Sequence, residues 1–119
     1  MLYGIGVDIV GVGRFKKALS KWGGRLEARL FTEGELAYCK AKKNFAEHLA
    51  VRFAAKEATI KALGDKSLSF KSIEVVNAKD GRPSITVEGL SGDYNLMVSL
   101  SHEREYGVAQ VIVEKSGSS

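Results

Sequence analysis

Residues 44–64 read NFAEHLAVRFAAKEATIKALG, and this stretch is the strongest indication of the fold in the sequence. Apolar residues recur in it at helical spacing, which predicts one long helix. Asn44, followed three residues later by Glu47, has the form of a capping box at the start of that helix. Gly64 comes directly after Leu63 and is suited to a left-handed cap at its end. The predicted apolar face runs through Leu49, Ala50, Phe53 and Ile60.

The segments before this helix change from a strand period to a helical one. Residues 2–10 alternate apolar residues with small or polar ones, which predicts a strand. Residues 12–22 have helical spacing, and Gly23-Gly24 is expected to break or bend that helix. Residues 32–42 open on the capping-box pattern Thr-Glu-Gly-Glu and predict a second, short helix. The apolar side predicted for the first helix holds Phe15, Leu19, Trp22 and Leu26.

The chain after the long helix is predicted to be β structure. Residues 73–76 and 84–87 flank Asp80-Gly81 and indicate a hairpin, with Pro83 at a strand start. Residues 96–101 and 108–113 form a second pair around a polar turn. An N-terminal strand, three helices and then antiparallel strands predict a single α+β domain over residues 1–115. We expect the remaining residues, 116–119, to be a disordered tail.

Composition limits the kinds of protein that the chain can be. Its 119 residues are 45% hydrophobic, which suits one compact domain whose site is shallow or completed by another subunit. The formal net charge of +4 favours an anionic partner. Cys39 is the only cysteine, which excludes an internal disulfide and a zinc cluster. The sequence has no signal-peptide pattern and no run long enough to span a membrane, so we expect a cytoplasmic protein without a membrane partner.

Two acidic residues stand in apolar company. Glu57 falls in the middle of the predicted apolar face, where a buried carboxylate needs a cation. Asp8 shares its strand face with two glycines, whose missing side chains let another element or a ligand approach. Each acid has a plainer interpretation: Glu57 pairs with Lys61 or reaches solvent, and Asp8 pins the following turn. Together they suit Mg²⁺, which two carboxylates hold with water and phosphate oxygens.

Basic residues surround this pair of acids in the sequence. Arg52, Lys56 and Lys61 stand near Glu57, and His102 follows Ser-Leu-Ser later in the chain. Cationic groups beside a magnesium site suit a polyphosphate, whose charge the metal only partly neutralises. The plain alternative for Arg52 and Lys56 is a solvated helix edge, and for His102 it is an ordinary turn histidine.

The first helix has a basic stripe of its own. Such a stripe is usually a solvated face, but it also suits an acidic protein, since complementary charge raises the encounter rate. It lacks aromatic residues interleaved with the charges, so we do not expect nucleic acid as the partner. The stripe consists of Arg14, Lys17, Lys21 and Arg25.

These residues resemble the holo-[acyl-carrier-protein] synthases, which are 4′-phosphopantetheinyl transferases. Residues 4–9, GIGVDI, look like their N-terminal signature, and residues 52–58, RFAAKEA, followed by Lys61-Ala62 and Gly64, look like their central one. Phe31-Thr32 with Glu35, and residues 99–102, SLSH, match in order and spacing. The resemblance extends to about Glu114. The loop after Gly64 is shorter than is usual in the family. We therefore assign no contacts with the pantetheine arm to this loop.

The resemblance implies a 4′-phosphopantetheinyl transferase-like fold and a set of roles. Asp8 and Glu57 would be magnesium ligands, Lys61 would sit at the coenzyme A pyrophosphate, and Arg52 and His102 would contact the 3′-phospho-adenosine end. Such enzymes transfer 4′-phosphopantetheine from coenzyme A to a serine of apo acyl carrier protein, in fatty acid biosynthesis, and release adenosine 3′,5′-bisphosphate. Glu57 is our candidate for the base that takes the serine proton.

The resemblance also implies partners. The family is trimeric, with coenzyme A between subunits, and the acidic carrier protein gives the basic stripe a use. Two other hypotheses are a basic nucleic-acid- or protein-binding module without catalysis, and a structural oligomer whose acids are satisfied by lysine and arginine.

Overall fold

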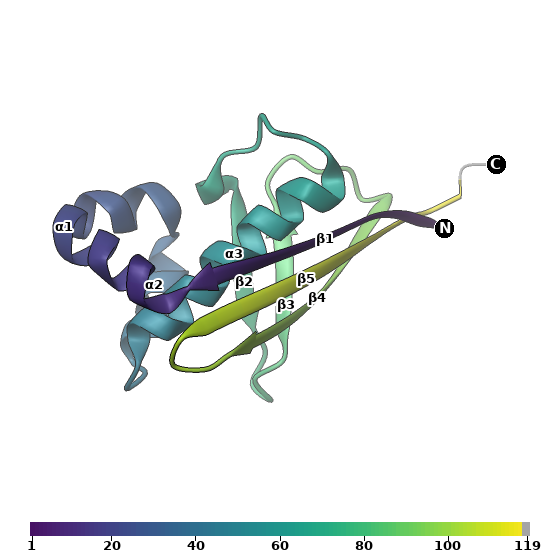
Figure 1. Cartoon of the computed structure of the whole chain (residues 1–119). Coiled ribbons are helices and arrows are strands. Elements are labelled where there is room, and N and C mark those ends of the chain that lie inside the picture. Colours follow the sequence, from purple (N-terminus) through teal and green to yellow (C-terminus); the bar gives the residue numbers. More distant parts are fainter. Residues whose placement is uncertain (118–119) are drawn as a thin grey trace.

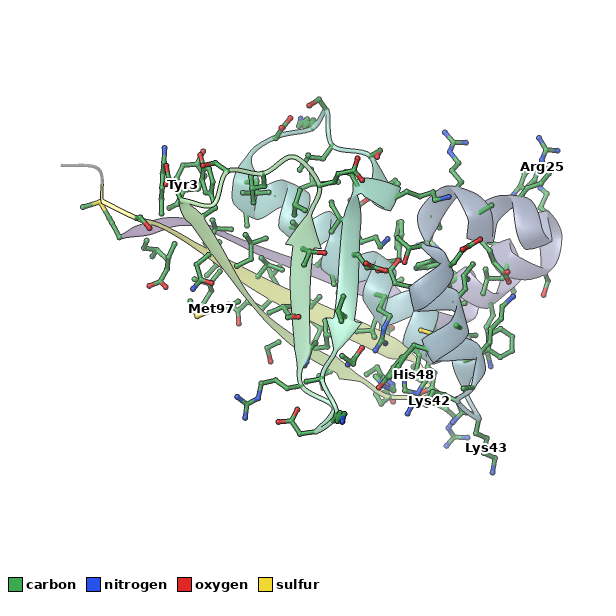
Figure 2. All side chains as sticks on the ribbon, turned by 180° about the vertical axis from the view of Figure 1, so that it is seen from behind. Tyr3, Arg25, Lys42, Lys43, His48 and Met97 are labelled. Atoms are coloured by element: carbon green, nitrogen blue, oxygen red, sulfur yellow. The ribbon has the colours of Figure 1, made fainter. Side chains whose placement is uncertain are left out.

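The long helix predicted at residues 44–64 is the central element of the fold. In the computed structural model, which describes residues 1–117, this helix is α3, and strands flank it on both sides (Figures 1 and 2). Helices α1 and α2 gather at one end of the molecule, and the described ends of the chain lie at the other (Figure 1). The elements are β1 (Leu2–Gly11), α1 (Val12–Leu30), α2 (Glu33–Lys40), α3 (Phe45–Leu63), the 3₁₀ turn η1 (Phe70–Ser72), β2 (Ile73–Asn77), β3 (Pro83–Val87), β4 (Tyr94–His102) and β5 (Tyr106–Lys115).

The strands form two antiparallel sheets around α3. One has the order β1-β5-β4, so the first strand pairs with the last, and the other is the β2-β3 hairpin. Pro83 begins β3, as the hairpin prediction required. The core between the sheets is made of small α3 residues against branched residues of β2, β3 and β5. The predicted α+β domain is confirmed.

Two glycines of β1 explain how closely α3 approaches the sheet. A Cβ atom added to Gly4 would overlap the carbonyl oxygen of Ala62, and one added to Gly6 would overlap that of Ala58. The strand therefore touches the helix backbone directly. The sequence left open whether another element or a ligand approaches this glycine face, and in the structure it is another element, helix α3.

The burial of α3 corrects the expectation for Glu57. The side of α3 that is fully buried carries alanines, among them Ala54, Ala55 and Ala58. Phe53, Glu57 and Ile60 are half-buried and lie at the edge of the helix contact. Phe53 and Ile60 do pack against the core, as predicted, but the expectation that Glu57 lies in the middle of the buried face was wrong, because the strands on both sides select small residues for the closest approach. Glu57 therefore keeps part of its hydration.

The helix ends partly follow the predictions. Thr32 and Glu35 form the expected capping box at α2. Asn44 makes no side-chain cap at α3, and the Glu47 side chain contacts His102 instead of completing a capping box. Helix α1 is bent at Gly23, which has φ 56° and ψ −136°, and continues to Leu30. Trp22, expected in the core, is 52% exposed at this bend.

Three further points bear on the expectations. Cys39 is a buried free thiol. None of the helices in the described part of the chain is long and apolar enough to cross a membrane. The expected disordered tail covers residues 116–119, of which 118–119 lie outside the described residues.

Candidate active site

Asp8 and Lys61 meet where β1 crosses α3. The Lys61 Nζ atom lies 3.1 Å from Asp8 Oδ1 and also donates to the Val7 carbonyl oxygen at 3.0 Å. Asp8 is on the same strand face as Gly4 and Gly6, so the close packing of that face carries its carboxylate to the helix. The pinned-turn interpretation of Asp8 was wrong.

Glu57 lies one helical turn before Lys61, on the same side of α3. Among the described residues, none forms an ion pair or a hydrogen bond with its carboxylate. Of the two plain interpretations of Glu57, the pair with Lys61 was wrong, because Lys61 reaches across to β1, and the position at a partly exposed edge is the one present. Asp8 and Glu57 thus flank one lysine, each at least partly open to solvent.

The two carboxylates fit one kind of metal site. No cluster of three or more His, Cys, Asp or Glu side chains within residues 1–117 could enclose an ion. Mg²⁺ needs no such cage, since it is usually bound through one or two carboxylates with waters and substrate phosphates. The partly exposed carboxylates of Asp8 and Glu57 are the ligand type that this ion uses.

Arg52 and His102 come together in a separate pocket. It has a volume of about 190 Å³ and is lined by Arg52, His102, His48, Tyr38, Asn77 and Pro83, among others. Arg52 is only 3% exposed, so the solvated-edge interpretation was wrong. Its guanidinium donates to the His48 carbonyl oxygen at 3.0 Å and to Asn77 Oδ1 at 2.8 Å, and its Nε is buried without a partner.

Electrostatics in the Arg52 pocket favour an anion. The His102 Nδ1 atom lies 3.1 Å from Glu47 Oε1, and its ring packs edge-on against His48, with the centroids 4.7 Å apart. Burial, followed by the neighbouring His102 and Arg52, lowers the pKa of His48, and Glu47 opposes the shift. The lowered pKa favours the neutral form of His48, so the Arg52 guanidinium, whose Nε is buried without a partner, is the group that would attract an anion here.

The two groups of candidate residues lie on different sides of α3. At about 100° per residue, the nine positions from Arg52 to Lys61 turn the helix through two and a half turns. Arg52 consequently faces β2 through Asn77, whereas Lys61 faces β1 through Asp8. One copy of the chain does not bring the five predicted site residues into a single cleft.

An apolar hollow adjoins the Asp8 side of the helix. Its volume is about 570 Å³, and it opens between β1, α1, α3 and η1. Phe15, Leu30, Phe53 and Phe70 form its walls, and Arg14 and Arg29 are the charged residues among those that line it. Ile9, which lines the hollow, directly follows Asp8 in β1, and Phe53, which also lines it, lies one turn before Glu57 in α3.

The basic stripe of α1 is exposed, as predicted. Arg14, Lys17, Lys21 and Arg25 are all on the surface, and Figure 2 shows Arg25 at the end of the molecule, projecting from α1. The stripe is not free of aromatic residues, because the Lys21 Nζ atom lies 5.0 Å from the centroid of the exposed Trp22 ring.

Comparisons with known proteins agree on one family. The family model of the 4′-phosphopantetheinyl transferase superfamily matches residues 4–111. A holo-[acyl-carrier-protein] synthase from Thermodesulfovibrio yellowstonii is 46% identical, over 95% of this chain and 99% of its own length. The chain belongs to the holo-[acyl-carrier-protein] synthases of this superfamily.

Solved structures of synthases have the same fold. A holo-(acyl-carrier-protein) synthase from Bacillus anthracis, in complex with CoA (3′,5′-ADP), has a TM-score of 0.85 and 40% identity, over 98% of this chain and 99% of that one. The synthase of Helicobacter pylori in complex with coenzyme A has a TM-score of 0.82 and 30% identity, over 92% and 99%.

Sequence reasoning missed some residues of this synthase fold. His48 lines the Arg52 pocket and precedes Arg52 by four positions, a helical spacing that could have indicated it. Arg29 follows Arg25 by the same interval and lines the apolar hollow. Lys56, considered for phosphate contact or for a solvated helix edge, is fully buried in an ion pair with Glu35, so both interpretations were wrong.

Proposed function

We propose that this chain transfers 4′-phosphopantetheine from coenzyme A to a serine hydroxyl of apo acyl carrier protein, with Mg²⁺, and releases adenosine 3′,5′-bisphosphate. The single observation that carries the proposal is the arrangement around Lys61, with Asp8 at 3.1 Å and Glu57 one turn away. Two carboxylates and one ammonium suit a pyrophosphate. The apolar hollow, lined by Ile9 next to Asp8 and by Phe53 one turn before Glu57, suits a long uncharged arm joined to it.

Each residue of this cluster has a role in the proposed reaction. Asp8 and Glu57 would hold Mg²⁺, which when bound neutralises charge on the pyrophosphate. Lys61 would donate its ammonium hydrogens to pyrophosphate oxygens, orienting the phosphorus for attack. Glu57 would accept the proton of the serine hydroxyl while the serine oxygen forms the new bond to phosphorus. The bond between that phosphorus and the oxygen of the departing adenosine 3′,5′-bisphosphate would break in the same step.

Arg52 and His102 would bind the 3′-phospho-adenosine end of coenzyme A. Since they lie on the other side of α3 from Lys61, we propose that they act with Asp8, Glu57 and Lys61 of a neighbouring subunit. A homotrimer supplies that neighbour. The outer face of the β1-β5-β4 sheet supports this assembly, because it exposes apolar side chains that a partner would cover: Ile5, Val7, Ile9, Met97 and Val108.

The α1 stripe would dock the acyl carrier protein, whose acidic surface complements it. Charge complementarity of this kind chiefly accelerates association. We therefore expect added salt to raise the KM for the carrier protein more than the KM for coenzyme A. The proposal places the reaction in fatty acid biosynthesis in the cytoplasm.

Mass spectrometry of apo acyl carrier protein, incubated with this chain, coenzyme A and Mg²⁺, tests the reaction. We expect the mass increment of one phosphopantetheine group, lost on chelation of the metal. Asp8→Ala and Glu57→Ala should each abolish the increment while the circular dichroism spectrum is kept. Asp93→Ala is the matched control, because Asp93 is an exposed acid at the other end of the sheet.

This assay and a separate DNA-binding measurement distinguish the transferase from the alternatives. Full activity of either Asp8→Ala or Glu57→Ala would contradict the metal assignment. Salt-sensitive DNA binding without coenzyme A binding would favour a nucleic-acid module instead.

The trimer has its own test, by light scattering of the chain in solution. Ile5→Lys should dissociate it, because the charged side chain cannot be buried against a partner. Val76→Lys is the control, since Val76 is a comparably exposed strand residue on the hairpin sheet. A wild-type chain that is monomeric at working concentration would contradict the assembly.

A further inference from the structure

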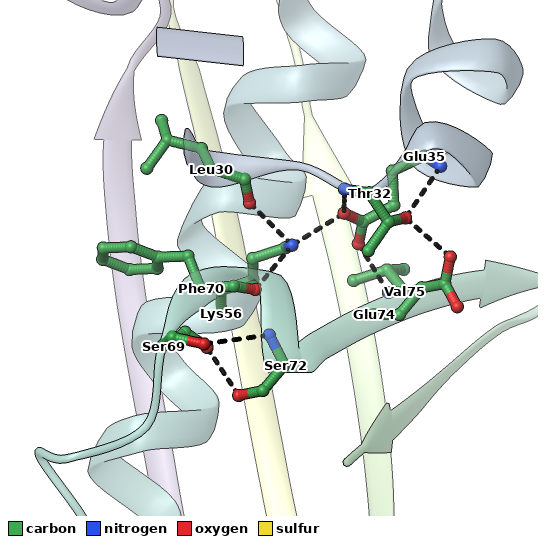
Figure 3. A network of polar contacts seen from close by, with 9 residues as sticks. All are labelled: Leu30, Thr32, Glu35, Lys56, Ser69, Phe70, Ser72, Glu74 and Val75. Atoms are coloured by element: carbon green, nitrogen blue, oxygen red, sulfur yellow. Dashed lines mark hydrogen bonds and ion pairs between the residues drawn. The ribbon is translucent and has the colours of Figure 1, made fainter. Parts of the chain in front are cut away.

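A fully buried ion pair lies next to the proposed metal ligand Glu57. Lys56 precedes Glu57 in α3, and its Nζ atom lies 2.7 Å from Glu35 Oε1 with both side chains completely buried. Figure 3 shows the ammonium between three acceptors. The other two are the carbonyl oxygens of Leu30, at 2.8 Å, and Phe70, at 2.9 Å. All three ammonium hydrogens are thereby used.

The Glu35 carboxylate extends this network to two more segments. Its Oε1 atom accepts from the Thr32 backbone N–H at 2.9 Å, and its Oε2 atom accepts from the Val75 backbone N–H at 2.7 Å. Two side chains thus connect α3 with the end of α1, the start of α2, the η1 turn and β2 (Figure 3).

Stability alone does not account for such a pair. Taking two charges out of water costs about as much as their attraction returns, so apolar residues of the same shape often stabilise a protein equally well. Apolar residues, however, make no directional bonds. The ammonium fixes where the Leu30 and Phe70 carbonyl groups lie relative to α3, and this geometric restraint is what an apolar pair would lose.

The restrained segments are walls of the site. Leu30 and Phe70 line the apolar hollow together with Phe53, whose ring centroid is 5.5 Å from that of Phe70 and which lies one turn before Glu57 on α3. We propose that Lys56 and Glu35 are positioning residues, which hold these two walls in register with the Asp8–Glu57 side of α3 without touching substrate. This inference rests on the proposed function.

Steady-state kinetics of matched variants test it, with coenzyme A affinity measured separately by calorimetry in Mg²⁺. Lys56→Met should lower the melting temperature by more than about 10 °C, because it leaves a buried carboxylate uncompensated. Lys56→Met with Glu35→Gln removes both charges and should recover most of that loss. If the pair positions the walls, kcat of the folded double variant stays at least about 10-fold below wild type, since small misplacements are costly in catalysis.

The affinity for coenzyme A should change little in the same double variant, because the phosphate-binding groups Arg52, Lys61 and His102 are intact. Lys40→Met with Glu27→Gln is the control. That Lys–Glu pair, at 2.6 Å, also joins α1 to α2, but it is solvent-exposed and apart from the apolar hollow. Its kcat should equal that of wild type. Lys56→Gln has a side chain one bond shorter, with two N–H donors instead of three, so it cannot hold all three acceptors and its kcat should fall between those of Lys56→Met and wild type.

The outcomes separate this inference from the proposed function. A folded double variant with wild-type kcat would show that the pair is structural only, and so would a loss confined to coenzyme A affinity. If Lys56→Met and the double variant do not fold, Lys56→Gln decides, and wild-type kcat there overturns the inference. A wild-type chain that leaves apo acyl carrier protein unmodified overturns both the proposed function and the inference built on it.

Discussion

Lys61 lies against Asp8, with its ammonium nitrogen 3.1 Å from one carboxylate oxygen, although the two residues are 53 positions apart. The contact exists because two glycines let β1 touch the backbone of α3. In the proposed reaction, a Mg²⁺ ion bound to Asp8 would share this carboxylate with Lys61, which would place the lysine beside the pyrophosphate.

Replacing Lys61 should therefore affect function far more than folding. For Lys61→Met we expect kcat/KM to fall by about two orders of magnitude, because the pyrophosphate loses one of the positively charged groups that would contact it. The free energy of unfolding should change by less than about 1 kcal/mol, since the pair is half-exposed. Chemical denaturation and carrier-protein kinetics measure the two effects. Lys79→Met, in the exposed β2–β3 turn, is the control for loss of charge.

Mixing two inactive variants tests whether a site is shared between subunits. Asp8→Ala and Arg52→Ala should each be inactive alone. After subunit exchange at equal amounts, about one quarter of the sites would combine an intact Asp8 with an intact Arg52 from the neighbour. We expect that share of wild-type activity to return. No recovery, with exchange verified by native mass spectrometry, would place both residues in one subunit's site.

Gly6 should tolerate no side chain. Its Cβ position overlaps the Ala58 carbonyl oxygen, so Gly6→Ala must push β1 from α3, and we expect a loss of about 2–4 kcal/mol in the free energy of unfolding. Gly13→Ala is the matched control, because nothing lies within 4 Å of a Cβ at Gly13. It should be neutral or slightly stabilising. Urea denaturation compares the two, and equal stabilities would contradict the direct contact between strand and helix.

The histidine pair predicts a pH dependence with a definite sign. Burial and the nearby His102, Arg52 and Lys42 lower the pKa of His48 below its ordinary value, against the opposing charge of Glu47. The unfolded chain therefore binds this proton at higher pH than the folded one. Stability from His48 is present above about pH 6.5 and is lost as the pH falls through the lower folded value.

The chain has only two histidines, so NMR can follow each imidazole. The signal that disappears in His48→Gln should titrate below the ordinary range for histidine. A His48 signal with an ordinary or raised midpoint would contradict the packing around Arg52. Figure 2 shows His48 in the first turns of α3 and Lys42 close to it, in the turn that precedes this helix.

Much of the fold was predictable because it is encoded locally. The Thr32–Glu35 capping box, the hairpin at Asp80-Gly81 and the left-handed Gly64 each act within a few residues. Most errors concern contacts between distant elements, such as that of Lys61 with Asp8. The error at Trp22 is local: its helical spacing was counted into the expected break at Gly23-Gly24, and Trp22 is exposed at the bend there.

The site shows the same division. The residue types of Asp8, Glu57 and Lys61, and their match to a family, came from the sequence, because chemistry depends on which groups are present. Which groups meet depends on the tertiary structure: Lys61 pairs with Asp8 instead of Glu57, and Lys56 pairs with Glu35. The separation of Arg52 from Lys61 around α3 follows from helix geometry, but its significance appears only with the strands in place.

An α+β domain with a basic first helix and two acids suited to Mg²⁺ could be predicted from the amino-acid order alone, since periodicity, caps and residue chemistry are local properties. Which of the charged residues are buried, and how they pair, became known only from the folded chain. Burial depends on strands from both ends of the chain closing around α3, and no local pattern records which side chain will then be left at the surface.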